Sequence, residues 1–431
     1  MGRKVFISFL GTGNYEAIRY ASTVEEANQV QPLRFFQEAS LALLQNELTE
    51  GDKVLIMTTK GSMKNWLDGE HFNFRTNEKV WHEGLQSRLT QMNLRCSFEN
   101  IPIADGQNTQ EIWEIFSLVF QHLQEGDQLY FDITHGFRSL PMLNMVLINY
   151  AKLLKNISVE KILYGAFEAK IKAETLEYAP IWDLISFVEL QDWTNEATLF
   201  LKTGNAAGIS ELIHHPEFIS LKEHLTDFSN QILVNRGLDI FSGKSAVALR
   251  QELKDLKNHP KVAPALAPIL DKINHEFDDY KHDEAINGFL AVRWCIKNGL
   301  IQQAATLMEE FITTFVMVEL GLESEIHNSS KRLLINAMVT LGDDKTLDAQ
   351  KNSDLQSFQD EYVVKVRALS FKKKIGRISN DLKSAIRNDI NHAGFRKEAR
   401  GYTEFQTSIV KRYRDLKKII SSVKNINLPE L

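Results

Sequence analysis

The feature that most constrains the fold is an alternation of strand-like and helix-like stretches over the first 190 residues. The apolar, β-branched runs fall at 4–10, 53–59, 94–103, 127–134 and 157–167. The helix-like stretches between them fall at 32–47, 77–92, 108–125 and 139–155. This order predicts an α/β, Rossmann-like domain, because each return to a parallel strand needs a crossover, and crossover helices cover both faces of the sheet. Residues 172–184 predict a hairpin after the fifth run.

The remainder of the chain predicts an all-helical structure from about residue 195 onward. Breakers at 204–208 and 258–268 separate helical segments, and 288–316 predicts a strongly helical block. The polar stretch 342–356 predicts a surface loop. We therefore expect three domains: an α/β domain at 1–190, a helical middle domain at 191–285 and a helical C-terminal domain at 286–431.

Composition indicates the cellular compartment of the protein and excludes some classes of protein. The chain has 431 residues, of which 43% are hydrophobic, and only two cysteines, Cys96 and Cys295. Two cysteines argue against a disulfide framework or a cysteine zinc site. No apolar run reaches the roughly 18 residues of a membrane span. We expect a cytoplasmic protein without a membrane partner.

Charge is distributed unevenly along the chain. The net charge is −6, yet residues 361–431 hold 17 Lys or Arg against 7 Asp or Glu, a balance of +10. A basic segment on an acidic body predicts a localised site for a polyanion, although a solvated helical surface would have the same composition.

The first strand-like run ends in a glycine turn at the edge where ligands bind in parallel sheets. The turn consists of Gly11, Thr12, Gly13 and Asn14. It is not the dinucleotide fingerprint, because Glu16 occupies the place of the third glycine and the next clear helix starts only near Pro32. A plain strand-to-loop turn explains it equally well. Thr58 and Lys60 follow the second strand and are expected at the same edge.

The sequence DITHGFRSLP, residues 132–141, comes at the end of the fourth strand and is a more specific signal than the glycine turn. A turn at His135 and Gly136 leads to Ser139, a helix N-cap, with Pro141 in the first helical turn. The loop would bring hydroxyl, imidazole, backbone N–H and guanidinium groups to a helix N-terminus, which is an anion site. In the alternative reading, Asp132 and His135 only hydrogen-bond the turn.

Together, FLGTGNY and DITHGFRSLPML resemble the CARF domain of type III CRISPR accessory ribonucleases, over roughly residues 1–190. The resemblance implies that two domains pair and that their cleft binds a cyclic oligoadenylate, with cyclic tetra-adenylate favoured over cyclic hexa-adenylate. It implies no other cofactor. With Thr58 and Lys60, the implied ligand-binding residues are Gly11, Thr12, Gly13, Asn14, Thr134, His135, Gly136, Phe137, Arg138 and Ser139.

A second motif, RNDINH at 387–392, lies in an amphipathic stretch. At about 100° per residue, an apolar stripe forms on one face. The stripe consists of Ile378, Leu382, Ile386, Ile390 and Ala393. Arg387 and His392 then lie about 140° apart on the opposite face, with Asn388 between them. Geometry alone favours a solvated helix face.

The pattern R-x4-H, with Asn388 directly after Arg387, is similar to the signature of HEPN ribonucleases. The resemblance implies a homodimer in which each subunit supplies Arg387, Asn388 and His392 to one composite catalytic site. His titrates near neutral pH and Arg binds phosphate, so these residues suit metal-independent attack of the RNA 2′-OH on its own phosphate.

These resemblances imply a cyclic-oligoadenylate-activated endoribonuclease that cleaves single-stranded RNA in type III CRISPR antiviral defence. The alternative is a ligand-controlled nucleic-acid-binding regulator with the same sensor and no catalysis, for which the basic C-terminus would be only a binding surface.

Overall fold

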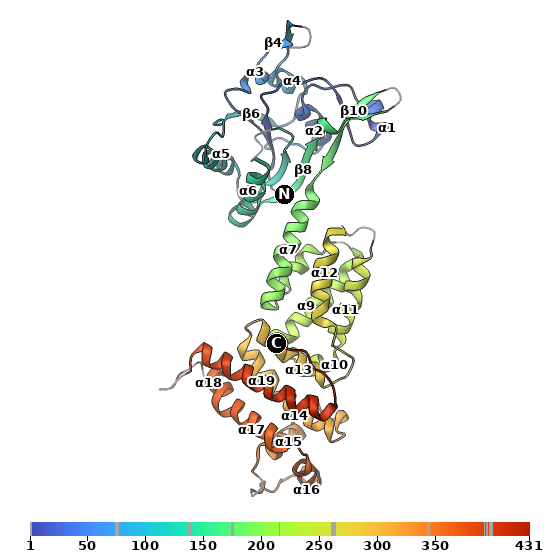
Figure 1. Ribbon diagram of the computed structural model, residues 1–431, viewed down its shortest axis with the longest axis vertical. Helices are drawn as coiled ribbons and strands as arrows, with labels where there is room; N and C mark the ends of the chain where they lie inside the picture. The colour runs from blue at the N-terminus through green and yellow to red at the C-terminus, as the bar shows by residue number, and fades with distance from the viewer. Residues whose placement is uncertain are drawn as a thin grey trace. The chain divides into compact units, whose positions relative to one another are not determined.

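The computed structural model describes residues 2–73, 77–135, 140–173, 176–214, 216–259, 264–342, 345–391, 393, 395 and 400–431 (Figure 1). The chain divides into two compact units, Met1–Glu189 and Leu190–Leu431. The first unit is α/β and the second is helical. The predicted fold class is confirmed.

The first unit is built on one mixed sheet with the strand order β2-β10-β8-β7-β1-β3-β6. Five of its strands run parallel: β1 (Lys4–Leu10), β3 (Lys53–Thr58), β6 (Ser97–Pro102), β7 (Gln128–Asp132) and β8 (Ser158–Gly165). The antiparallel edge consists of β10 (Glu177–Asp183), which pairs with β8 and with β9 (Ile171–Lys172). The β9–β10 pair is the hairpin expected from the sequence. The short β2 (Arg19–Ala21) pairs with β10.

The two faces of the sheet carry separate cores because successive residues of a strand point to opposite sides. Val5, Ile7 and Phe9 of β1 pack with residues of α5 (Thr109–His122) and α6 (Leu140–Lys155). Phe6 and Leu10 pack on the other face. That face is covered by α2 (Phe36–Leu44) and α4 (Leu85–Gln91). Both faces of the central strands are therefore buried, as in a doubly covered parallel sheet.

The sequence prediction is wrong at two places in the first unit. Residues 77–92 do not form one helix: the hairpin of β4 (Gly69–Asn73) and β5 (Glu78–His82) precedes α4. Val80 and Trp81 favour strand, and an extended Gly84 breaks the segment. A helix also begins before Pro32, because Thr23 caps α1 (Val24–Gln29).

The second unit consists of helices around one large core. Its helices are α7 (Ile185–Thr203), α8 (Ala207–Leu212), α9 (Ile219–Leu233), α10 (Gly237–Ser242), α11 (Lys244–Lys257), α12 (Ala267–Asn274), α13 (Ile286–Lys297), α14 (Ile301–Glu319), α15 (Ser329–Thr340), α16 (Ser353–Ala368), α17 (Lys372–Asp381), α18 (Asn388–Asn391) and α19 (Tyr402–Lys424). A π-helical segment, Leu382–Arg387, joins α17 to α18. In the part of the chain with described structure, no helix is long and apolar enough to cross a bilayer.

The predicted helical block at 288–316 is confirmed and consists of two helices, α13 and α14, because Gly299 adopts a φ of +71° and ends the first of them. One prediction for the second unit needs correction. The expected loop at 342–356 is shorter, because the Asn352 side chain accepts hydrogen bonds from Asp354 and Leu355 and so caps α16. The predicted boundary near residue 285 within the helical unit stays a prediction.

Candidate functional site

The strand order places a topological switch point between β1 and β7. From β1 the chain proceeds to β3 and β6 on one side of the sheet, and then to β7 and β8 on the other. Open α/β sheets bind ligands outside the carboxyl ends of the strands at such a point. The turn at Gly11–Asn14 follows β1, and Thr134 and His135 follow β7. The fold thus brings together the two stretches that the sequence identified.

The turn after β1 is held by a buried side chain that the sequence analysis missed. Asn65, on α3 (Met63–Trp66), donates hydrogen bonds to the carbonyl oxygens of Gly11 and Gly13, each at 2.9 Å. The Gly11 N–H donates to Tyr15 Oη at 2.7 Å, so it is already satisfied within the protein. A Cβ on Gly11 would lie 2.9 Å from that Oη, whereas one on Gly13 would meet no atom within 4 Å. Gly11 is therefore required by packing, and Gly13 faces open space.

His135 packs against this turn. Its ring lies edge-on to Tyr15 with centroids 4.7 Å apart, and its Nε2 atom is buried with no hydrogen-bond partner in the described part of the chain. Burial lowers the pKa of His135 to about 4, so the ring is neutral at pH 7. A neutral imidazole recognises a ligand by hydrogen bonding rather than by charge.

A second missed residue, Arg34, supplies positive charge beside the same cluster. Tyr15 packs on Phe35 at 5.0 Å, and the Arg34 guanidinium lies 5.4 Å from the centroid of the Phe35 ring. The Nε and Nη1 atoms of Arg34 are buried, and no described residue forms a hydrogen bond with them. Burial first, and the Arg34 charge second, lower the pKa values of His71 and His82 on the β4–β5 hairpin. No local sequence signal marks Arg34, because only the fold brings it here.

Asp132 has a structural role at the end of β7. The carboxylate is fully buried and accepts hydrogen bonds from Ser8 Oγ of β1 at 2.6 Å and from the Thr134 N–H at 2.8 Å. The bond from Thr134 is a hydrogen bond to the turn of the kind that the alternative reading described, and the bond from Ser8 in addition links β1 to β7. Burial raises the pKa of Asp132 to about 6 against these hydrogen bonds.

The remaining predicted ligand residues differ in their surroundings. Thr134 Oγ1 accepts a hydrogen bond from the Gly165 N–H at 2.8 Å. Thr58 is buried and donates to Asn100 Oδ1 at 2.5 Å, which is a packing role, whereas Lys60 is exposed. Thr12 and Asn14 are exposed on the turn. Four predicted residues lie outside the described part of the chain: Gly136, Phe137, Arg138 and Ser139.

The pKa values of Asp132 and His135 are shifted in opposite directions, so their effects on the pH dependence of the free energy of unfolding oppose each other. Between pH 4 and 6 the folded state holds more protons at Asp132 than the unfolded state, so this group adds stability as pH falls. Between pH 6.5 and 4 the folded state holds fewer protons at His135, so that group removes stability over the same range. Each contribution is about 3 kcal/mol, so the two nearly cancel.

Substitution of His135→Gln should remove one of these contributions. The variant is expected to gain stability relative to the unsubstituted protein as pH falls from about 6.5 to about 4, by up to about 3 kcal/mol. Urea unfolding of both proteins at several pH values measures the difference. A difference that stays constant with pH would contradict the assignment.

The second candidate site lies at the end of α17. Ile378, Leu382 and Ile386 are buried, and Ile390 is half-buried, as the predicted stripe requires. Ala393 does not belong to the stripe, because it is exposed and its φ of +51° places it beyond the helix. Asn388 is exposed. The Arg387 backbone closes the π segment, whereas its side chain and the whole of His392 lie outside the described structure.

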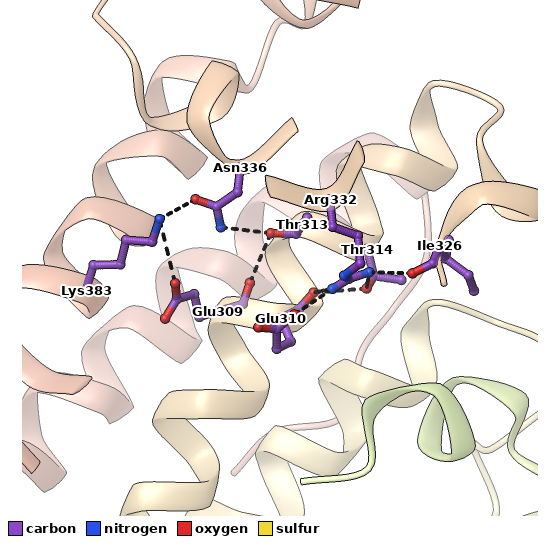
Figure 2. Close-up of polar contacts among 8 residues, drawn as sticks. All are labelled: Glu309, Glu310, Thr313, Thr314, Ile326, Arg332, Asn336 and Lys383. Carbon is purple, nitrogen blue, oxygen red and sulfur yellow. Dashed lines mark hydrogen bonds and ion pairs between the residues drawn. The ribbon is translucent and has the colours of Figure 1, made fainter. Parts of the chain in front are cut away.

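The π segment is anchored from the side of α14 and α15 (Figure 2). Lys383 Nζ donates to Asn336 Oδ1 at 2.5 Å and lies 3.8 Å from the buried Glu309 carboxylate. Asn336 in turn donates to Thr313 Oγ1 at 3.0 Å. Beside this network, Arg332 of α15 binds Glu310 of α14 at 2.7 Å. π turns are rare and are frequent at functional sites, so the anchored backbone that leads to Arg387 supports a functional role for this segment.

Gly376 of α17 shows how closely this helix packs on α15. A Cβ at this position would lie 2.3 Å from the Val339 carbonyl oxygen. Gly376→Ala is therefore expected to lower the free energy of unfolding by about 1–3 kcal/mol, because the helices must separate. Urea unfolding measures this loss. Gly237→Ala is the matched control, since a Cβ there meets no atom within 4 Å, and an equal loss in both variants would contradict the explanation.

Comparisons with known proteins show what the chain is similar to. A family model described as "CRISPR-associated protein MJ1674, second domain" matches residues 189–283. The CRISPR-associated protein MJ1674 of Methanocaldococcus jannaschii is 25% identical over 332 residues, which cover 75% of this chain and 46% of that protein. The chain thus spans about half the length of this relative. Among solved structures, Enterococcus italicus Csm6 bound to cyclic hexa-2′-fluoro-hexa-dAMP covers 99% of this chain and 96% of that one, with 11% identity and a TM-score of 0.45.

The family model and the relative both show similarity to CRISPR-associated proteins, in agreement with the resemblance of the two sequence motifs. The order that this resemblance implied, an α/β domain followed by a helical one, is the order of the two units in the structure. Within the described ranges, no three His, Cys, Asp or Glu side chains form a metal-binding group.

Proposed function

We propose that the chain is an endoribonuclease of type III CRISPR defence that a cyclic oligoadenylate activates. The observation that carries this proposal is the meeting of the β1 and β7 turns at the switch point, in a chain that ends with an R-x4-H segment and is similar to a CRISPR-associated protein. The first unit is the sensor and the second is the effector.

The sensor cleft suits a ligand that carries both phosphates and bases. Gly13 leaves open space beside the turn, and Lys60 is exposed at the same sheet edge. Arg34 provides buried N–H groups that have no hydrogen-bond partner among the described residues. Cationic side chains and backbone groups at a sheet edge bind phosphate, and the neutral His135 ring can hydrogen-bond or stack on a base. Cyclic tetra-adenylate is the proposed activator, with cyclic hexa-adenylate as the alternative.

The effector site is proposed to form when two chains bring their Arg387, Asn388 and His392 residues together. Arg387 would neutralise charge on the phosphoryl oxygens, and His392 would transfer protons to or from the 2′-OH and the leaving oxygen. Asn388, exposed directly after the π segment, would position the phosphate. The reaction would leave a 2′,3′-cyclic phosphate and a 5′-hydroxyl.

Activation requires that the ligand bind one arrangement of the dimer more tightly than another. The helices of residues 191–285 are the proposed transmitters, since they lie between sensor and effector in the sequence. The shift in the equilibrium between the two arrangements cannot exceed the ratio of the ligand's affinities for them.

A fluorogenic single-stranded RNA assay tests the proposal. Cleavage is expected in EDTA with one cyclic oligoadenylate and only at a low level without it. RNA that stays intact with both cyclic tetra-adenylate and cyclic hexa-adenylate would refute the proposal that the chain is a nuclease. RNA binding that responds to the activator without cleavage would instead establish the non-catalytic regulator.

A further inference from the structure

A groove in the helical unit separates α17 from α19. Its volume is about 580 Å³. The residues that line it come from the two helices and their flanks: Ser370, Phe371, Lys374, Arg377, Ile378 and Asp381 on one side, and Lys411, Arg412, Asp415, Lys418, Ile419, Ser422 and Val423 on the other. It lies in the segment of the chain that carries the excess of positive charge.

Most cationic side chains of the groove form no ion pair within the described structure. Lys374, Arg377, Lys411 and Lys418 are exposed, and within the described structure none of them pairs with a carboxylate. Arg412 differs, because it binds Asp381 at 3.0 Å and Ser408 at 2.5 Å. Five cations against two carboxylates give the groove a net positive charge.

The cations form two rows that face each other across the groove. Lys374 and Arg377 are three residues apart on α17, and Lys411 and Lys418 are seven residues apart on α19, so each pair lies on one face of its helix. Buried apolar side chains, including Ile378 and Ile419, stabilise the helices beneath the rows. Two rows of fixed cations along a groove match a linear polyanion better than a single bound anion.

We propose that this groove binds the sugar–phosphate backbone of the single-stranded RNA substrate and leads it to the segment of Arg387 and His392. The proposal rests on the proposed nuclease function. It follows from continuity of the helix, because α17 runs without a break into the π segment that ends at Arg387. At a rise of 1.5 Å per residue, Arg377 lies about 15 Å along the axis from Arg387.

Charge reversal in the groove tests this assignment. Lys374→Glu/Lys411→Glu is made in the cleavage-deficient His392→Ala background, and binding of a labelled RNA of about 12 nucleotides is followed by fluorescence anisotropy. The affinity is expected to fall at least tenfold at about 50 mM salt, and the slope of log affinity against log salt should decrease by about 0.7 for each lost phosphate contact. The milder Lys374→Ala/Lys411→Ala should show the same change with a smaller amplitude.

The matched control is Lys244→Glu/Lys254→Glu, because both lysines are exposed on α11, away from the groove, and the change in net charge is the same. Equal losses of affinity in both double variants would overturn the proposal, since the effect would then come from net charge alone. Unchanged RNA affinity in folded groove variants would also overturn it. A changed oligomeric state with unchanged RNA affinity would identify the groove as a contact between copies of the chain.

The groove and the nuclease can fail separately. If the unsubstituted protein cleaves RNA and the groove variants bind RNA as well as it does, the nuclease proposal stands and the groove proposal is refuted. RNA binding that depends on the groove, without any cleavage, would support the groove and refute the nuclease.

Discussion

Arg387→Ala is expected to lower activator-dependent RNA cleavage by about 10³-fold, because it removes a cation that neutralises developing charge on the phosphoryl oxygens. His392→Ala should cost about 10²–10⁴-fold through the loss of proton transfer. The double variant should lose little more than either single variant, because residues that act as a unit are not additive. Single-turnover cleavage at saturating activator measures all three.

The control for this experiment is Arg236→Ala, an exposed arginine in the helical unit far in sequence from the R-x4-H segment. This variant should cleave RNA at the same rate as the unsubstituted protein. Circular dichroism and sedimentation must show that the Arg387 and His392 variants are folded and have the same oligomeric state. Folded variants of both residues that still cleave RNA would refute the catalytic assignment and favour the non-catalytic regulator.

Asn65→Ala should have the largest effect on activation. Its buried amide holds the carbonyl oxygens of Gly11 and Gly13, so its removal leaves the turn without support and two carbonyl groups without this donor. The activator concentration for half-maximal cleavage is expected to rise at least tenfold, whereas the rate at saturating activator should change little. Titration of the cleavage rate with cyclic oligoadenylate measures both.

Asn28→Ala is the matched control, because Asn28 donates a comparable side-chain hydrogen bond to the Val24 carbonyl oxygen on the exposed helix α1. Its activation curve should coincide with that of the unsubstituted protein. If Asn65→Ala also leaves the curve unmoved, the turn after β1 does not contact the activator.

The strands of the sheet were predictable because buried parallel strands read as continuous apolar runs. The runs at 4–10 and 53–59 became β1 and β3. The hairpin at 69–82 was missed because both strands have only five residues and β5 is mostly exposed, so neither gives a clear period. The helical block at 288–316 was predictable, whereas its division into two helices was not, since the apolar pattern continues through Gly299, which adopts the left-handed region.

The candidate ligand site at the ends of β1 and β7 was predictable only in part. The two turns could be found from the sequence, because each directly follows a strand. Asn65 and Arg34 could not, since a single polar residue carries no periodic signal and its partners are distant in sequence. The role of Asp132 was also open, and only the hydrogen bond from Ser8 shows that it joins neighbouring strands.

The π turn before Arg387 has a consequence for tolerance to insertions and deletions. A π turn holds about one residue more than an α turn, so the helix from Lys372 to Asn391 accommodates an extra residue without interrupting its backbone hydrogen bonds. Loss of one residue here, with a return to α-helical winding, would leave the direction of the residues downstream almost unchanged, because the wide turn had absorbed the extra residue. A residue added or lost in regular α winding would instead rotate everything downstream by about 100°. The π turn therefore allows the number of residues between Gly376 and Arg387 to change by one while the backbone direction at Arg387 is kept.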